Sequence, residues 1–146
     1  MLSPLTYFIV LAMVCVYAFV RGGLESRVAA AICGVASIAS VIVMSPMAGR
    51  YSRIESGVFF VDAAVLVGFT AIALRSDRFW PLWLAGLQLT TILAHLFKAV
   101  DLQLIPQVYA AAARFWVYPI FLIIVIGTWR GHRRGRMATS AAAYPS

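Results

Sequence analysis

The chain has 146 residues, of which 63% are hydrophobic and only 12% are charged, and its formal net charge is +7. An ordinary soluble domain is about half apolar and about a quarter charged, so this composition excludes a typical soluble globular protein and indicates a membrane protein. The basic residues lie mostly at the ends of apolar runs, which favours a role in membrane topology. We therefore expect no nucleic-acid partner, because nucleic-acid binding requires a face that displays a basic patch.

Five apolar runs are long enough to cross a membrane, since about 20 helical residues span about 30 Å of hydrocarbon. Arg21 follows the first run instead of preceding it, which favours a retained helix over a cleaved signal peptide. Pro119 is expected to kink the fifth run. We predict an all-α, polytopic bundle over residues 1–129, with transmembrane helices at about 4–20, 28–45, 57–74, 79–101 and 107–129. Residues 130–146 are basic and have no apolar period, so we predict a disordered tail.

The distribution of arginines predicts the orientation of these helices. With the N-terminus outside, the cytoplasmic side holds eight arginines, namely Arg21, Arg27, Arg75, Arg78, Arg130, Arg133, Arg134 and Arg136. The outer side then holds only Arg50 and Arg53. Because basic residues are enriched in cytoplasmic loops, this pattern predicts a multi-pass protein of a bacterial inner membrane with a cytoplasmic C-terminus. The four arginines of the tail are expected to contact anionic lipid headgroups.

Small residues characterise the second run, and Ala30 and Gly34 form a small-xxx-small pair. Such a pair allows helix backbones to approach closely, either inside the bundle or at a dimer interface. We favour packing inside the bundle. Cys15 and Cys33 both lie within apolar runs, and we interpret them as small packing residues in preference to a redox pair.

The fourth run carries a polar stripe. Gln88, Thr91, His95 and Lys98 are spaced 3, 4 and 3 residues apart. This spacing places them on one face of a helix, because a helix has 3.6 residues per turn. Lipid disfavours polar side chains, so the stripe should face other helices or a wet cavity.

The predicted topology brings further charged residues to the level of this stripe. Counting helical rise from the outer boundary, Asp62, His95 and Arg114 each lie about 8–10 Å deep. We therefore hypothesise a buried polar cluster in the outer third of the membrane, formed by Asp62, His95, Lys98, Asp101 and Arg114, with Gln88 and Thr91 on the same stripe. Its simplest interpretation is a structural ion pair between Asp62 and Arg114, with Lys98 reaching the interface. The alternative is a ligand or proton site in which His95 changes charge near neutral pH.

We expect no cofactor, metal or catalytic residue. A bis-histidine haem needs two facing histidines within the membrane, and one chain offers only His95. A zinc site is not supported because His95 and the two cysteines fall in opposite halves of the predicted bundle.

The segments RSDRFWPLW (75–83) and GTWRGHRRGR (127–136) resemble those of short, uncharacterised polytopic proteins of bacterial inner membranes. This resemblance carries no known activity. We expect a small, non-catalytic accessory or structural subunit that packs against a membrane-protein partner or another copy of itself. The alternative is a small-solute or proton-coupled transport or binding protein that uses the polar cluster.

Overall fold

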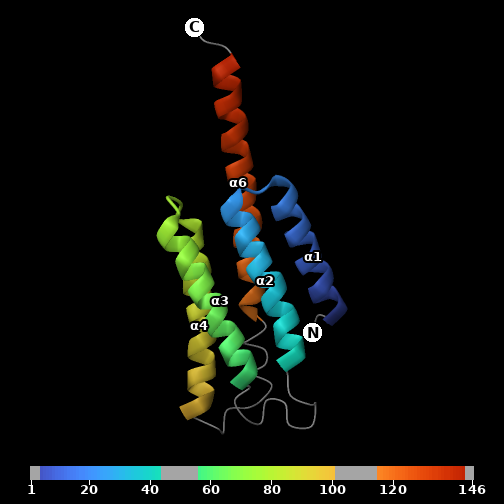
Figure 1. Ribbon diagram of the computed structural model, residues 1–146, viewed down its shortest axis with the longest axis vertical. Coiled ribbons are helices and arrows are strands. Elements are labelled where there is room, and N and C mark those ends of the chain that lie inside the picture. The colour runs from blue at the N-terminus through green and yellow to red at the C-terminus, as the bar shows by residue number, and fades with distance from the viewer. Residues whose placement is uncertain (1–3, 44–55, 101–114, 144–146) are drawn as a thin grey trace.

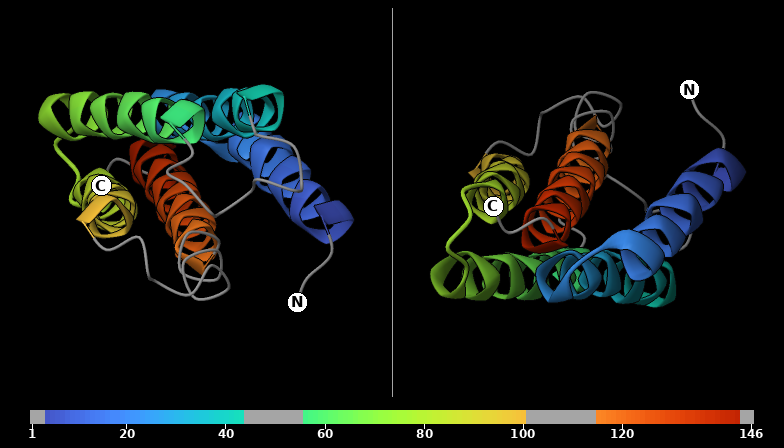
Figure 2. Two further views of the ribbon diagram at one scale, coloured as in Figure 1. Left: turned by 90° about the horizontal axis from the view of Figure 1, so that it is seen from below. Right: turned by 90° about the horizontal axis from the view of Figure 1, so that it is seen from above.

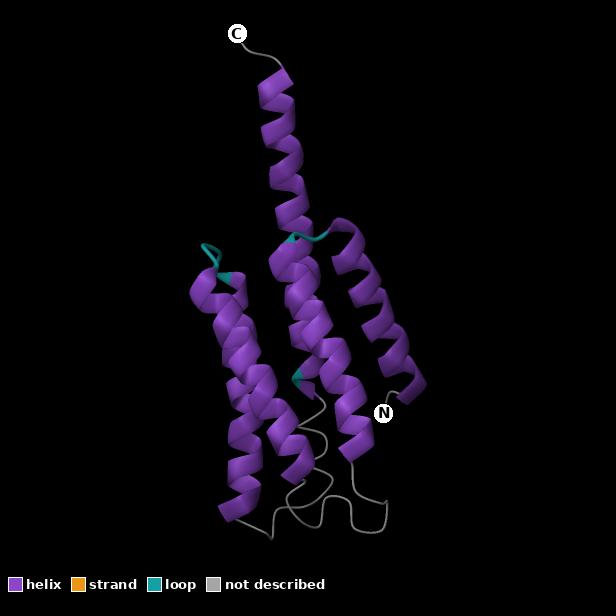
Figure 3. Cartoon of the chain, in the orientation of Figure 1, coloured by secondary structure: helices purple, strands orange, loops and turns teal. Residues whose placement is uncertain are grey.

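The protein is a bundle of α-helices. The computed structural model describes residues 4–43, 56–100 and 115–143. These ranges form α1 (Pro4–Arg21), α2 (Leu24–Val43), α3 (Ser56–Arg75), α4 (Trp80–Val100) and α6 (Val117–Ala143) (Figure 1). The described ranges contain helices and short turns and no strand (Figure 3). The prediction of an all-α bundle is therefore confirmed.

The helices pack in a ring, each against the next, and α6 closes the ring by contacting both α4 and α1. Seen along the bundle, α6 lies between α4 and α1, while α2 and α3 cover one side (Figure 2). Large apolar side chains fill the space between them, and Phe69, Leu84 and Ile124 are fully buried. This arrangement places the inward face of α4 against α3 on one side and α6 on the other.

Four helices, α1 to α4, are long and apolar enough to cross a membrane. The fifth predicted run, 107–129, begins outside the described residues. α6 supplies its apolar part from Val117 to Trp129, which is about 20 Å long at 1.5 Å per residue. Pro119 falls in the first turn of α6, where its missing N–H leaves no hydrogen bond unmade. The expected kink of the 107–129 run stays a prediction, because the residues before Phe115 lie outside the described part of the chain.

Residues 130–146 were predicted to be a disordered tail, but α6 continues as a helix through the basic segment to Ala143. Elongating an existing helix avoids the cost of nucleation. The added residues include Arg, Met and Ala, which are good helix formers. The lack of an apolar period therefore indicated exposure of this segment to solvent and not loss of helical structure.

Small side chains allow α1 and α2 to approach closely. Ala18, Ala29 and Ala30 are fully buried, and Cys15 Sγ lies 3.5 Å from the carbonyl oxygen of Ala30. At the turn, a Cβ on Gly22 would lie 2.3 Å from the carbonyl oxygen of Ala18, so only glycine fits there. The small-residue face of α2 is therefore used for packing inside the bundle.

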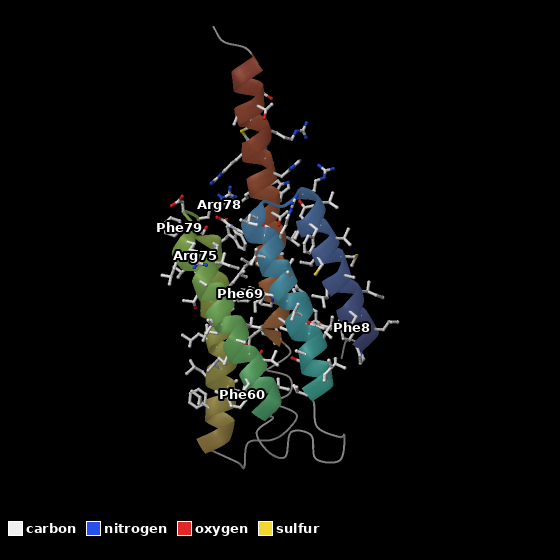
Figure 4. All side chains as sticks on the ribbon, viewed as in Figure 1. Phe8, Phe60, Phe69, Arg75, Arg78 and Phe79 are labelled. Carbon is white, nitrogen blue, oxygen red and sulfur yellow. The ribbon has the colours of Figure 1, made fainter. Side chains whose placement is uncertain are left out.

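One end of the bundle carries the α1–α2 turn, the α3–α4 turn and the basic part of α6 (Figure 4, which labels Arg75 and Arg78). Glu25 connects two of these elements: it accepts a hydrogen bond from Ser76 Oγ at 2.8 Å and pairs with Arg78 Nε at 3.6 Å. A nitrogen of Arg21 lies 3.0 Å from His132 Nε2, which connects α1 to α6. We call this end the basic end.

Candidate functional site

The main polar contact inside the bundle joins α3 to α4. Gln88 and His95 are seven residues apart on α4, which is two helical turns, so both side chains project from the same face. That face lies against α3 at Asp62. Gln88 Nε2 lies 3.0 Å from Asp62 Oδ1, and His95 Nε2 lies 3.0 Å from Asp62 Oδ2. We call these three residues the Asp62 cluster.

Both carboxylate oxygens of Asp62 are engaged by α4. Gln88 donates to Oδ1 and also to the main-chain carbonyl of Asp62 at 3.1 Å. His95 donates to Oδ2 when its hydrogen is on Nε2. Hydrogen bonds to an ionised carboxylate are about twice as strong as those between neutral groups. Among the described side chains, the arrangement therefore satisfies the acid without an arginine or a lysine.

The cluster is enclosed on the α4 side and more open on the α3 side. Gln88 and His95 are 4% and 3% exposed, whereas the Asp62 side chain is 21% exposed. The ring of Phe59, one turn before Asp62, packs edge-on against the His95 ring with centroids 5.8 Å apart. Phe59 thus limits the rotation of the imidazole and holds Nε2 toward the carboxylate.

The cluster lies in the half of the bundle far from the basic end. Asp62 is 6 residues after Ser56 and 13 before Arg75. At 1.5 Å per residue it is about 9 Å from the start of α3 and about 20 Å from Arg75. Asp62 is therefore well beyond direct contact with the side chains at the basic end.

Of the seven residues in the predicted cluster, the structure brings Asp62, Gln88 and His95 together. Thr91 is buried on the same face, but its hydroxyl is 3.5 Å from the carbonyl of Leu87 in its own helix. Lys98 belongs to α4, but its side chain lies outside the described residues, as do Asp101 and Arg114 entirely. The described contact is thus a hydrogen-bonded acid, amide and imidazole. The expected Asp62–Arg114 ion pair stays a prediction, because Arg114 lies outside the described residues.

The four tail arginines lie on the helical extension of α6. Arg133 and Arg136 line a groove between α6 and α1, and Arg130 and Arg134 do not. The guanidinium of Arg133 lies over the Trp129 ring, 5.0 Å from its centroid. Sequence reasoning treated the four as equivalent, although the spacing 129, 132, 133 and 136 is that of one helical face and could have separated them.

Sequence reasoning also missed a polar contact between α1 and α2. Ser37 donates to the carbonyl of Cys33 at 2.7 Å, so its oxygen is available to accept from the Tyr7 hydroxyl, 2.6 Å away. The tyrosine at the start of α1 and the serine on the α2 face gave only a weak signal, because each residue is common at helix contacts.

The chemistry that the Asp62 cluster can perform is limited. The described residues include no group of three or more His, Cys, Asp and Glu side chains that could hold a metal ion. The cluster can hold two helices together or share a proton between carboxylate and imidazole. Comparison of the chain with protein-family models, curated proteins and solved structures finds no match, so the site is interpreted from its geometry.

Proposed function

We propose that this chain is a five-span protein of the bacterial inner membrane and a non-catalytic accessory or structural subunit. In this proposal the N-terminus is outside and the basic end is cytoplasmic. The subunit packs against a membrane-protein partner or another copy of itself. The gathering of Arg21, Arg75, Arg78 and the α6 arginines at one end supports this orientation, because cytoplasmic ends are enriched in basic residues.

One observation carries the non-catalytic role: both carboxylate oxygens of Asp62 are already engaged by side chains of α4. A carboxylate oxygen can accept more than one hydrogen bond, but both oxygens of Asp62 direct a contact to α4. The strongest acceptor of α3 thus connects α3 to α4, and the hydrogen bonds offset part of the cost of placing an acid in hydrocarbon. The Asp62 cluster is therefore best interpreted as a structural connection.

The outer surfaces of α1 and α2 agree with this role. Large apolar side chains such as Phe8, Phe19, Ile38 and Ile42 are exposed along them. In a bilayer, such surfaces face lipid tails or the apolar face of another helix. These two helices therefore provide the contact surface that an accessory subunit requires.

A proton-coupled transport or binding role is the second candidate. It is favoured by the pairing of a carboxylate with an imidazole at 3.0 Å, together with the partial exposure of Asp62. Such pairs pass protons in many membrane pumps and transporters. In this case Asp62 would exchange protons with water on the α3 side of the bundle.

Proton flux separates the two candidates. The wild-type chain, Asp62→Asn and the control Thr70→Val, an exposed position on α3, are reconstituted into liposomes that contain a pH-sensitive dye. For an accessory subunit we expect all three to match empty liposomes, and Asp62→Asn to unfold at a lower temperature in detergent. A proton flux that Asp62→Asn abolishes and Thr70→Val retains would contradict the accessory role.

Assembly is tested separately. Membranes that contain the chain at its native level are extracted with an amphipathic polymer, and the particle mass is measured by native mass spectrometry. We expect a particle larger than one chain, either a homo-oligomer or a complex with a stoichiometric partner. A monomer across all extraction conditions would contradict the subunit proposal.

A further inference from the structure

A groove of about 860 Å³ separates α1 from α6 at the basic end. Pockets that hold a drug-sized ligand measure roughly 300–1,000 Å³, so the groove is large enough for a molecule of that size. It lies away from the Asp62 cluster, and the proposed function leaves it unused. Its two walls differ in chemistry.

Apart from Arg21 and the hydroxyl of Tyr17, the α1 wall is apolar. Met13, Val16 and Val20 line it at spacings of three and four residues, which is one helical face. From Met13 to Arg21 this face is about 12 Å long, at 1.5 Å per residue. It offers an extended hydrocarbon track that runs from the basic end toward the middle of the bundle.

The α6 wall is basic where the groove opens at the basic end. His132, Arg133 and Arg136 line it, and Arg21 joins them from α1. The Arg21–His132 contact and the position of Arg133 over Trp129 hold three of these groups in place. In the described part of the chain no acidic side chain lines the groove, and the nearby Glu25 is engaged with Ser76 and Arg78.

An apolar track that ends in a basic cluster matches an amphiphile with a negative head. We propose that the α1–α6 groove binds one anionic phospholipid. Its phosphate contacts Arg133 and Arg136, and one acyl chain lies along Met13, Val16 and Val20. Arginine is suited to this role because its planar donors match phosphate oxygens. The inference depends on the membrane insertion in the proposed function but not on the accessory role.

The apolar wall that α1 adds to the groove supports a lipid over a small soluble anion. A soluble anion needs only the basic cluster and gains nothing from the apolar wall. A phospholipid uses both walls, because it buries its chain against α1 while its phosphate remains at the level of Arg21 and Arg133. Arg130 and Arg134 are on the same stretch of helix but not in the groove, which makes them matched controls.

Native mass spectrometry of the full chain in detergent tests the headgroup. The chain is titrated with phosphatidylglycerol and with phosphatidylcholine of the same acyl composition. We expect one phosphatidylglycerol to bind preferentially. Removing two phosphate-binding arginines should weaken binding about tenfold or more, so Arg133→Gln/Arg136→Gln should lose the adduct. Arg130→Gln/Arg134→Gln, with the same change in charge, should retain it. Equal losses in the two double variants, or equal binding of the two lipids, would overturn the proposal.

A second set of measurements tests the acyl chain. Val16→Trp fills the apolar track at an exposed position, and we expect it to weaken phosphatidylglycerol binding while circular dichroism shows unchanged helix content. Inorganic phosphate should not displace the lipid. Displacement by phosphate at comparable concentration, or undiminished binding to Val16→Trp, would show a simple anion site and overturn the proposal. These variants leave Asp62 intact, so their failure is distinguishable from failure of the accessory role, which depends on flux and particle mass.

Discussion

The indole ring of Trp80 lies directly against Gly127, so α4 and α6 meet across a position that has no side chain. A Cβ added to Gly127 would lie 2.8 Å from Trp80 Cδ2, whereas carbon atoms pack at about 3.5–4.0 Å. In the described part of the protein, Trp80 Nε1 and the neighbouring Thr128 Oγ1 are buried without a hydrogen-bond partner. This helix contact is therefore held by close packing and not by polar bonds.

Gly127→Ala should destabilise the bundle by about 1–3 kcal/mol, the usual effect of overpacking, because the rigid indole has to move. The control is Gly86→Ala, on the exposed face of α4, where nothing lies within 4 Å of the added Cβ. Gly86→Ala should be neutral or stabilising, because alanine favours the helix. Thermal unfolding in detergent measures both. Equal effects at the two positions would mean that the Trp80 contact does not limit the packing.

Asp62→Leu should lower the free energy of unfolding by roughly 1–3 kcal/mol, because it removes the carboxylate that accepts hydrogen bonds from buried Gln88 and His95. Replacing all three residues by leucine should recover part of that loss, since the polar groups that lost the carboxylate are then removed as well. Chemical or thermal unfolding in detergent gives both values. A triple variant less stable than Asp62→Leu would show that the three residues stabilise the bundle by more than the hydrogen bonds among themselves.

The Glu25–Arg78 pair should contribute less than about 1 kcal/mol, because the two side chains are 32% and 42% exposed and solvent screens their attraction. Glu25→Gln keeps an acceptor for Ser76 and should have a small effect that disappears at high salt. Glu25→Ala loses both contacts and should cost more. Unfolding temperatures at low and high salt distinguish the two contributions. A large, salt-insensitive effect of Glu25→Gln would contradict this assignment.

The proposed orientation makes its own prediction. A green fluorescent protein fused after residue 146 should fluoresce, and alkaline phosphatase at the same point should be inactive, because the proposed orientation places residue 146 in the cytoplasm. Replacing Arg130, Arg133, Arg134 and Arg136 by glutamine should produce a mixed orientation, since the positive charge that retains this end is lost. An unchanged single orientation would show that Arg21, Arg27, Arg75 and Arg78 suffice.

Hydropathy alone predicted the helical bundle, because α1 to α4 are each long enough and apolar enough on average to cross a membrane. The spacing of Gln88, Thr91 and His95 predicted one face of α4, and counting helical rise placed Asp62 at the same level as His95. Both steps need only the geometry of a single helix, so both are accessible from sequence.

Other contacts depend on how each helix is rotated, which hydropathy does not determine. The packing of the Trp80 ring on Gly127 depends on the rotations of both α4 and α6. Glu25 and Arg78 come from elements more than 50 residues apart, and their pairing follows from the way in which two turns meet. The helix beyond Trp129 was missed because a solvated helix that extends from a packed one needs no apolar face of its own.

The segment of α6 beyond Trp129 is continuous with the part that packs in the bundle, so α6 is one helix that extends past the other helices. Ala143 is 14 residues from Trp129, or about 21 Å along the helix axis. A tilt of about 10° at Trp129 would therefore move Ala143 sideways by about 4 Å at this rise per residue. The far end thus amplifies small reorientations of the bundle, and a spin label or fluorophore placed there would detect them before one placed among the packed helices.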